Sequence, residues 1–501
     1  MRDSTQAERK ELRNSSLRVM ALIPALVLIL AAAPLPAAAP PAELWVSADR
    51  GWDAGDGSRA APLRTLGRAV VVARRLPRPL RVRVEPGTYY LNESLAFAQA
   101  DGGASPAESV LWAAEKAVPG LEPPGRTVIS GGAPLAQTCW KRSAATPGAW
   151  SCVLPPHLAG VDIRAVWVGD EPYHLARWPD RDDANPSIHG HGYAWATDGI
   201  GGHTGASVPP LSELAYPAQP SSGFRFACNG TRWARPSAAA VHIFPKFHWG
   251  NLVYRVGSMA PGADGLCAVH FRAGGGQINA GLLPYATDID NTSKFFVEGL
   301  REFFDSPGEF WVEKKSAAET VLHILPRPNH DLTRQPVVIP RLVRLVEYQG
   351  SAVSQDSALP EEAALSPQVA NLHLQGFTFQ HAAPSYLLDF EAPDLGDMSI
   401  SRQGALWMEG VVNCSVTNLT FDRVQGNAVF ISHAATNVST PRIEHERRLR
   451  SPGSSERLLF LNRCGSTGVL STERARQASR SSARRSARLA SGRWPSRANA
   501  S

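Results

Sequence analysis

Hydrophobic and polar residues alternate in two similar stretches of the chain, Asn371–Gln380 (NLHLQGFTFQ) and Asn413–Asp422 (NCSVTNLTFD). Each begins with Asn, has an aliphatic residue at its fourth position (Leu374, Val416) and reaches Thr-Phe before a final polar residue. A third Asn followed by Val-Ser is Asn437, so the spacings are 42 and 24 residues. Alternation predicts half-buried strands. A repeat of about 20–25 residues with several short strands predicts one turn of a β-solenoid.

Stacked turns would place Leu374 over Val416 and Phe379 over Phe421, about 4.8 Å apart. The spacing of 42 fits one turn plus an insertion of 18 residues, for which 385–402 is the obvious stretch. The alternative is a coincidental likeness between two Asn-rich strands.

Earlier parts of the chain show other patterns. Four apolar residues at helical spacing predict a short amphipathic helix: Leu66, Ala69, Val70 and Ala73. Residues 80–97 read as strand, Pro-Gly turn and strand. From about 126 to 340, short strands such as TVISGG and TVLHILP alternate with loops rich in Gly, Pro and Ser. Within that region, Lys294–Phe304 has the spacing of a helix.

The net charge is unevenly distributed. The whole chain carries +6, but residues 441–501 hold fourteen Arg and four Glu, so the residues before them carry −4. An acidic body argues against nucleic acid as a partner, since that role needs a basic surface. The 441–501 segment has no periodicity, and Arg outnumbers Lys 44 to 7 in the chain. We interpret it as a frameshifted or mis-spliced end, the alternative being a genuine disordered basic tail.

The N-terminal segment predicts export. Residues 19–39 are apolar and end in small residues, as in a secretory signal peptide. The stretch is also long enough to span a bilayer as an uncleaved anchor, although three prolines disfavour a spanning helix. We therefore expect a secreted protein, bound to the membrane only if this segment is retained.

Cysteines and sequons suit that compartment. Cys139 and Cys152 flank a Pro-Gly turn that would bring them together, which predicts a disulfide; Cys228 and Cys267 are a second candidate pair. Free buried thiols are the alternative for each pair. Sequons predict glycosylation at six sites: Asn92, Asn229, Asn291, Asn413, Asn418 and Asn437.

Several stretches together support a family resemblance. LWVSADRGWDAGDGSRAAPLRTLGRAV followed by RVRVEPGTYYL resembles the N-terminal coil of the pectate-lyase-like superfamily of right-handed parallel β-helix proteins. RAVWVGDEPYHLARWPD, FFVEGLREFFDSPGEFWVE, LQGFTFQH and GALWMEGVVNCSVTNLTFDRVQGNAVFIS resemble a secreted branch with an inserted β domain, which includes glycoside hydrolases acting on plant or algal polysaccharides. The resemblance covers roughly residues 44–440. The family's solenoids run further, and its catalytic carboxylates usually lie in those later turns.

The expected architecture is all-β. It consists of a right-handed parallel β-helix, a short N-terminal amphipathic helix and an inserted irregular β domain. The expected divisions are a signal peptide or anchor at 1–42, coils at 43–125 and 341–440, the insertion at 126–340 and the tail at 441–501.

Glycoside cleavage needs two carboxyl groups flanking the bond. The candidate catalytic acids of the coil region are Asp422, Glu409 and Asp397, with Asp389 and Asp394 beside them in the insertion. If Phe421 points into the core, Asp422 should point toward solvent. Each of these acids could equally be a solvated turn residue.

Trp407, His381 and His433 are candidate substrate contacts, although core packing for the Trp and turn-capping for the His residues are the alternatives. Arg177 and Trp178 suit a role in bracing the inserted domain against the β-helix. Asp53 and Asp56 lie in a loop that lacks the terminal Glu of a calcium site, so a plain turn is expected. No metal site and no cofactor is predicted.

The leading hypothesis is a secreted, monomeric glycoside hydrolase whose partner is a polysaccharide or other glycan. The alternatives are a non-catalytic glycan-binding protein of the cell surface or matrix, and a polysaccharide lyase. A lyase would need Lys or Arg as the catalytic base, and residues 341–440 contain no Lys.

Overall fold

The computed structural model describes residues 40–115, 125–201, 223–228, 232–278, 288–316, 319–350, 368–391, 398–432 and 435–446. These residues form an all-β fold with one α-helix, α3 (Leu66–Ala73). The short 3-10 turns are η1 (Gln99–Asp101), η2 (Pro106–Glu108), η3 (Gln137–Cys139), η4 (Pro156–Leu158), η6 (Pro236–Ala238) and η8 (Arg301–Phe303). The N-terminal 1–39 and the 447–501 segment lie outside the described residues.

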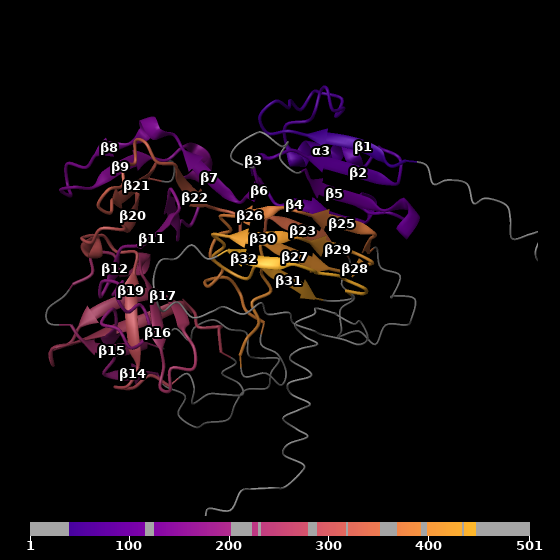
Figure 1. Ribbon diagram of the computed structural model, residues 1–501. Coiled ribbons are helices and arrows are strands. Elements are labelled where there is room, and N and C mark those ends of the chain that lie inside the picture. The colour runs from indigo at the N-terminus through magenta and orange to yellow at the C-terminus, as the bar shows by residue number, and fades with distance from the viewer. Residues whose placement is uncertain are drawn as a thin grey trace, which may run out of the picture. The chain divides into compact units, whose positions relative to one another are not determined.

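Three parallel sheets carry the repeats (Figure 1). Sheet I holds β1 (Ala42–Val46), β2 (Leu80–Val84), β5 (Val110–Ala114), β25 (Leu372–Gln375) and β29 (Ser415–Thr417). Sheet II holds β3 (Gly87–Tyr90), β6 (Thr127–Ser130), β26 (Thr378–Gln380), β30 (Leu419–Asp422) and β32 (Ile443–Glu446). Sheet III holds β4 (Leu95–Phe97), β23 (Val346–Gln349), β27 (Leu406–Glu409) and β31 (Val429–Ser432). A two-stranded pair, β24 (Val369–Ala370) and β28 (Val411–Val412), accompanies them.

The chain passes through the three sheets in turn, for example β25, β26 and β27, then β29, β30 and β31. The predicted stacking is confirmed, because Leu374 pairs with Val416 and Phe379 with Phe421 in parallel register. The Phe379 and Phe421 ring centroids are 4.8 Å apart, which is one strand spacing.

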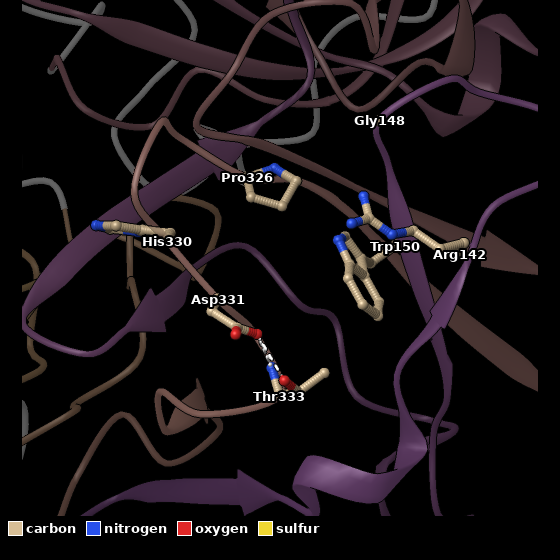
Figure 2. A pocket seen from close by; sticks show the side chains of 7 residues that line it. All are labelled: Arg142, Gly148, Trp150, Pro326, His330, Asp331 and Thr333. Carbon is tan, nitrogen blue, oxygen red and sulfur yellow. Dashed lines mark hydrogen bonds between the residues drawn. The ribbon is translucent and has the colours of Figure 1, made fainter.

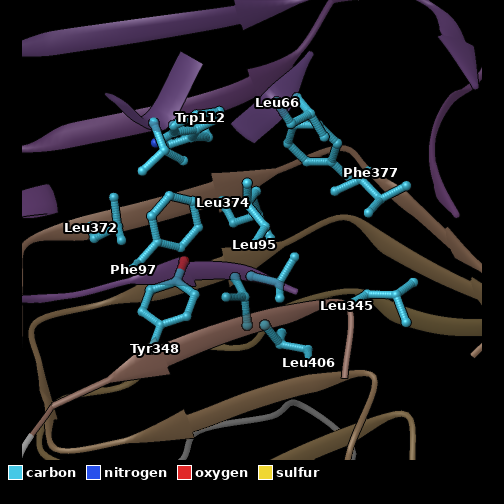
Figure 3. Packing of buried hydrophobic residues seen from close by; sticks show 14 of the residues in the cluster. Leu66, Leu95, Phe97, Trp112, Leu345, Tyr348, Leu372, Leu374, Phe377 and Leu406 are labelled. Carbon is cyan, nitrogen blue, oxygen red and sulfur yellow. The ribbon is translucent and has the colours of Figure 1, made fainter. Parts of the chain in front are cut away.

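The inward residues of these sheets form one hydrophobic core, which Figure 3 shows from close by. Phe97 lies between Trp112 and Tyr348, with ring centroids 5.2 and 5.5 Å away in edge-on geometry. Helix α3 packs on the same core through the four residues that its spacing predicted. Its start is fixed by Asp53, whose carboxylate accepts bonds from Thr65 N at 2.9 Å and Thr65 Oγ1 at 2.8 Å.

The repeated asparagines have a backbone role. Asn371, Asn413 and Asn437 adopt φ of 53°, 52° and 50°, a left-handed conformation that Asn tolerates better than most side chains. Asn437 Nδ2 donates to Asn413 Oδ1 at 2.7 Å, so the equivalent residues of adjacent layers are linked directly. The Asn of each repeat therefore makes the turn into the next strand.

Residues 132–340, called here the intervening segment, form two further sheets. Sheet IV contains β7 (Gly132–Leu135), β22 (Val337–Pro340), β10 (Val166–Val168), β11 (Glu171–Leu175), β20 (Glu309–Lys314), β21 (Thr320–Leu325), β9 (Trp150–Val153) and β8 (Lys141–Arg142). Sheet V contains β12 (Arg177–Trp178), β19 (Lys294–Glu298), β16 (Ala240–Phe244), β17 (Leu252–Pro261), β18 (Leu266–Gly274), β15 (Gly223–Ala227) and β14 (Asp198–Ile200), with β13 (Ala194–Trp195) on β19.

The intervening segment begins and ends through one antiparallel pair, which we call the neck. Strands β7 and β22 form it, with Gly132 opposite Pro340 and Leu135 opposite Val337. Both predicted disulfides are present, Cys139–Cys152 across the β8–β9 hairpin and Cys228–Cys267 between β15 and β18. Each crosslinks neighbouring strands of its own sheet.

Arg177 and Trp178 brace this segment internally. The Arg177 guanidinium lies 3.7 Å from the Phe296 ring centroid, and its Nε donates to Pro179 O at 3.0 Å. Trp178 stacks on Phe303 at 6.2 Å. These contacts brace the intervening segment internally, whereas the sequence predicts a brace between this segment and the β-helix.

Four sequence expectations need correction. Lys294–Phe304 is the strand β19 followed by the turn η8, because its Phe and Val residues pair across sheet V. Strand β6 pairs with β3 and β26 and so belongs to the parallel sheets. Strand β32 continues the parallel pairing beyond residue 440, where only a tail was expected. The sequence also predicts that the turn ending near Asn437 leaves Val429 and Ile431 as an exposed apolar end of the stack, but these residues are only 1% and 8% exposed.

Among the described residues, no helix has the length and apolar character needed to cross a bilayer. The 19–39 stretch lies outside the part of the chain to which this statement applies.

Candidate functional site

The outward face of sheet III carries acidic and aromatic side chains. Val346, Tyr348, Leu406 and Met408 point into the core and are fully buried. Successive residues of a strand point to opposite faces, so the residues between them lie on the outer face. In parallel register, Glu347 lies opposite Trp407 and Gln349 lies opposite Glu409. Two glutamates therefore sit diagonally on adjacent strands, with Trp407 between them.

Glu409 is held by an arginine from the connection between β26 and β27. Arg402 binds Glu409 Oε1 through one terminal nitrogen and Glu391 Oε2 through the other, the second contact being 2.9 Å. The guanidinium also lies 5.2 Å from the Phe430 ring centroid. Glu409 is 7% exposed, so Arg402 compensates a nearly buried carboxylate.

The carboxylate of Glu347 is held less closely by its arginine than the carboxylate of Glu409. Gln349 Nε2 donates to Glu347 Oε2 at 3.0 Å, and Arg344 NH1 lies 3.5 Å from the same oxygen. Arg344 covers one face of Trp407, with its guanidinium carbon 4.3 Å from the ring centroid. Trp407 Nε1 is buried and has no hydrogen-bond partner within the described residues. The Trp407 ring thus lies beside Glu347, and its N–H is left for another acceptor.

Asp422 is placed differently from the sequence expectation. It is the last residue of β30 and only 4% exposed, so it does not point toward solvent. Its Oδ2 accepts from Gln380 Nε2 at 2.8 Å and lies 3.3 Å from Arg423 Nε. Arg423 in turn binds Asp170 of the intervening segment at 2.6 Å. Asp422 is therefore part of a buried polar link on sheet II, whereas the two glutamates belong to strands of sheet III.

His381 is also buried rather than available to a substrate. It is 3% exposed, and its Nδ1 shares a hydrogen bond of 3.1 Å with Ser130 Oγ. Its ring meets Trp167 edge-on at 6.2 Å. Asp389 is exposed in the connection between β26 and β27, whereas Asp397, Asp394 and His433 lie outside the described residues.

The buried position of His381 predicts a pH effect on stability. Burial and the nearby Arg423 charge lower the pKa of His381 from 6.5 to about 3. The unfolded chain therefore binds a proton that the folded protein excludes, and the stability present above pH 6.5 is lost as the pH falls toward 3. One pKa unit corresponds to about 1.4 kcal/mol, so we expect about 2 kcal/mol to be lost between pH 6.5 and about 5.

His381→Asn should remove most of this slope, because Asn tolerates the φ of 55° at this position and has no proton to bind. Urea unfolding at several pH values measures the slope. The exposed His189→Asn is the control and should leave it unchanged. Equal slopes in the wild type and His381→Asn would contradict the prediction.

A buried polar cluster links the intervening segment to the connection that carries Arg402. Glu298 Oε1 accepts from Tyr386 Oη at 2.9 Å and from Arg164 NH1 at 3.1 Å, and lies 3.3 Å from His242 Nε2. Burial alone would raise the pKa of Glu298, but His242 and Arg164 lower it to about 2. Gln277 Nε2 donates to Tyr386 O at 2.8 Å, which adds a second link.

A surface cavity of about 510 Å³ lies in sheet IV and its loops, and Figure 2 shows its lining. Arg142 lies along Trp150, with its guanidinium carbon 4.2 Å from the ring centroid. Asp331 accepts from Thr333 N at 2.9 Å and Thr333 Oγ1 at 2.6 Å. Asp331 is the single carboxylate in this lining, so the cavity does not offer the pair that glycoside cleavage requires.

The predicted glycosylation sites stay a prediction. Asn92, Asn291, Asn418 and Asn437 are exposed, Asn413 is half-buried, and Asn229 lies outside the described residues. No group of three or more His, Cys, Asp or Glu side chains that could hold a metal ion occurs in the part of the chain described here.

Sequence reasoning named Glu409 and Trp407 but missed Glu347, Arg344 and Arg402. One signal was available for Glu347. It stands between Val346 and Tyr348, so an alternating strand puts it on the face opposite the core. The register that brings it next to Trp407 joins strands 60 residues apart and could not be read from either strand alone.

No protein-family model matches the sequence, and no curated protein matches it either. Among solved structures, one described as a glycoside hydrolase superposes with a TM-score of 0.56 at 17% identity, over 80% of this chain and 65% of that one. The complex of XylC with xylose gives a TM-score of 0.35 at 11% identity, over 80% of this chain and 53% of that one, which is too low to carry a structural argument. The chain thus spans less than two thirds of the length of either protein. It shares its all-β fold with a glycoside hydrolase.

Proposed function

We propose that this chain is a secreted, carbohydrate-active protein and that it hydrolyses glycosidic bonds of a plant or algal polysaccharide on the outer face of sheet III. In this proposal the three parallel sheets are the turns of a right-handed parallel β-helix, and the intervening segment is an inserted domain. The observation that carries the proposal is the pair Glu347 and Glu409, which share one face of adjacent strands beside Trp407.

The spacing of the pair suits this chemistry. A strand separation of about 4.8 Å and an offset of two residues place the two Cα atoms about 8 Å apart. Glutamate side chains extending from such positions reach the carboxyl separations used by glycosidases, about 5–5.5 Å for retention and about 6.5–9.5 Å for inversion. Trp407 would offer its half-buried ring to a sugar bound between them.

The arginine contacts suggest different roles for the two glutamates. Arg402 makes the closer contact and fixes the position of the Glu409 carboxylate, which suits a nucleophile or general base. Arg344 lies 3.5 Å from Glu347, which leaves Glu347 as the better candidate for the acid that protonates the leaving oxygen.

Two further observations support the proposal. The fold is shared with a glycoside hydrolase. Two disulfides fit an oxidising compartment outside the cytosol.

A non-catalytic glycan-binding protein is the second candidate. The observation that favours it is that each glutamate has an arginine within 3.5 Å, so both carboxylates are already bound by charged side chains. Carboxylates held in this way suit hydrogen bonding to sugar hydroxyls rather than proton transfer to a leaving oxygen.

Expression of the full chain in a secretory host, followed by incubation with a panel of polysaccharides and aryl glycosides, tests these candidates. New reducing ends without unsaturated products support hydrolysis. Retarded migration in glycan-containing gels without new reducing ends supports a binding protein. Unsaturated uronate products would instead identify a lyase.

A further inference from the structure

Two aromatic rings of the intervening segment are exposed together. Phe247 is 52% exposed and Trp249 is 58% exposed, and their ring centroids are 5.2 Å apart with an interplanar angle of 27°. Exposed aromatic surface gains nothing from the hydrophobic effect in the folded protein. Adjacent exposed rings of this kind therefore indicate a binding surface.

The backbone that presents these rings is strained. Phe247 and His248 have φ of 75° and 54°, the left-handed region that is unfavourable for residues other than Gly. Local contacts hold this conformation, because His248 N donates to Pro245 O at 2.8 Å and His248 Nε2 shares a bond of 2.8 Å with Thr292 O. Strain kept in place to expose apolar surface is typical of a ligand-binding loop.

This loop packs on the connection that positions the candidate active site. A Cβ on Gly250 would lie 3.0 Å from Ile278 Cδ1 and 3.6 Å from Met398 Cε, so the loop lies directly against both residues. Ile278 and Met398 form an antiparallel bridge between the intervening segment and that connection. The same connection carries Arg402, which binds Glu409.

The chemistry of the surface suits a sugar ring. The C–H face of a pyranose is apolar and flat and packs on an aromatic face, while its hydroxyls need polar neighbours. Lys246 lies 5.7 Å from the Phe247 ring centroid and supplies such a neighbour. The surface area of two side chains is far smaller than the roughly 800 Å² that each partner buries in a stable protein interface. This difference argues against a second protein chain as the ligand.

We propose that Phe247 and Trp249 form a stacking surface for sugar units of a polysaccharide whose scissile bond lies at Glu347 and Glu409. This inference rests on the proposed function and adds a requirement for an extended substrate. A monosaccharide aryl glycoside would occupy the carboxylate site alone, whereas a polymer would also lie on the two rings.

The test replaces Trp249 and Phe247 with alanine, singly and together, in the full chain. For the double variant we expect KM for the polysaccharide to rise at least about tenfold, with kcat changing less than KM. The rise should be at least about tenfold larger for the polymer than for an aryl glycoside of the same sugar. Trp249→Phe should restore most of the polymer affinity, and Trp52→Ala, which changes an equally exposed Trp elsewhere, should leave the kinetics unchanged.

Gel retardation by the same polysaccharide separates this inference from the proposed function. If the wild type is retarded but hydrolyses nothing, and the double variant is not retarded, the stacking surface stands and the hydrolase proposal fails. The inference is overturned if the double variant binds the polymer as well as the wild type, or if the wild type binds none. It is also overturned if the substitution converts a dimer to a monomer in size-exclusion chromatography, since the rings would then contact a second copy.

Discussion

Replacing Glu409 with glutamine is expected to slow polysaccharide cleavage by at least about 10³-fold, because a positioned acid, base or nucleophile contributes about 10²–10⁴-fold to such a reaction. Glutamine has nearly the same shape, and Arg402 keeps its contact with Glu391, so the free energy of unfolding should fall by less than the roughly 3–5 kcal/mol that a buried ion pair costs when one partner is lost entirely. Initial rates of reducing-end release and urea unfolding curves measure the two effects.

Glu347→Gln and Glu391→Gln complete this experiment. If Glu347 is the acid, its variant should lose much less activity on aryl glycosides with good leaving groups than on the polysaccharide, since those groups need no protonation. Added azide should restore turnover of such substrates by Glu409→Gln if Glu409 is the nucleophile. Glu391→Gln removes the other partner of Arg402 and should cost less than about tenfold. Wild-type rates in Glu409→Gln would remove this residue from the mechanism.

Replacing Glu298 with alanine is expected to lower the free energy of unfolding by about 3–5 kcal/mol, the usual cost of removing one partner from a buried charged group. Arg164 would lose an opposite charge at 3.1 Å, His242 would lose the carboxylate oxygen 3.3 Å from its Nε2, and the Tyr386 hydroxyl would lose its acceptor. Chemical denaturation at neutral pH measures the loss.

The pH dependence of this loss follows from the pKa of Glu298. The folded-state pKa is about 2 against an ordinary value of 4.5, so the carboxylate contributes stability above pH 4.5 that is lost as the pH falls through 2. The difference between the wild type and Glu298→Ala should therefore shrink below pH 4.5. Glu319→Ala, which breaks a surface ion pair with Lys315, is the control and should cost less than about 0.5 kcal/mol. A Glu298→Ala loss no larger than this control would contradict the account.

The parts of the fold that could be predicted from the sequence are those fixed by local periodicity. Phe379 and Phe421 stack because their repeats share one register, and the repeat is visible in ten residues of each strand. Helix α3 was predicted because its four buried residues follow one helical face. The Cys139–Cys152 disulfide joins two ends of a short hairpin, so its closure is also local.

What sequence reasoning missed depends on contacts distant in the chain. Asp422 looks solvent-facing in its own strand, but Gln380 from the layer below and Arg423, tied to Asp170 of the intervening segment, surround its carboxylate. Lys294–Phe304 has apolar residues at helical spacing, yet strands β16 and β12 offer it partners on both edges. Glu347 becomes a candidate site residue only because it lies beside Trp407 of another strand.

The neck formed by β7 and β22 bears on how this protein could have arisen. Gly132 and Pro340 pair directly, so the two ends of a segment of about two hundred residues leave the parallel sheets side by side, like the two strands of a hairpin. The entropic cost of closing a loop rises only slowly with the length of the loop. A site whose two chain ends already lie together therefore tolerates a long insertion. Gly132 also leaves room for Val338, since a Cβ there would come within 2.3 Å of Val338 Cγ1. A recombination event at this one junction could therefore exchange the whole segment, and with it the exposed aromatic loop, while every layer of the parallel sheets kept its register.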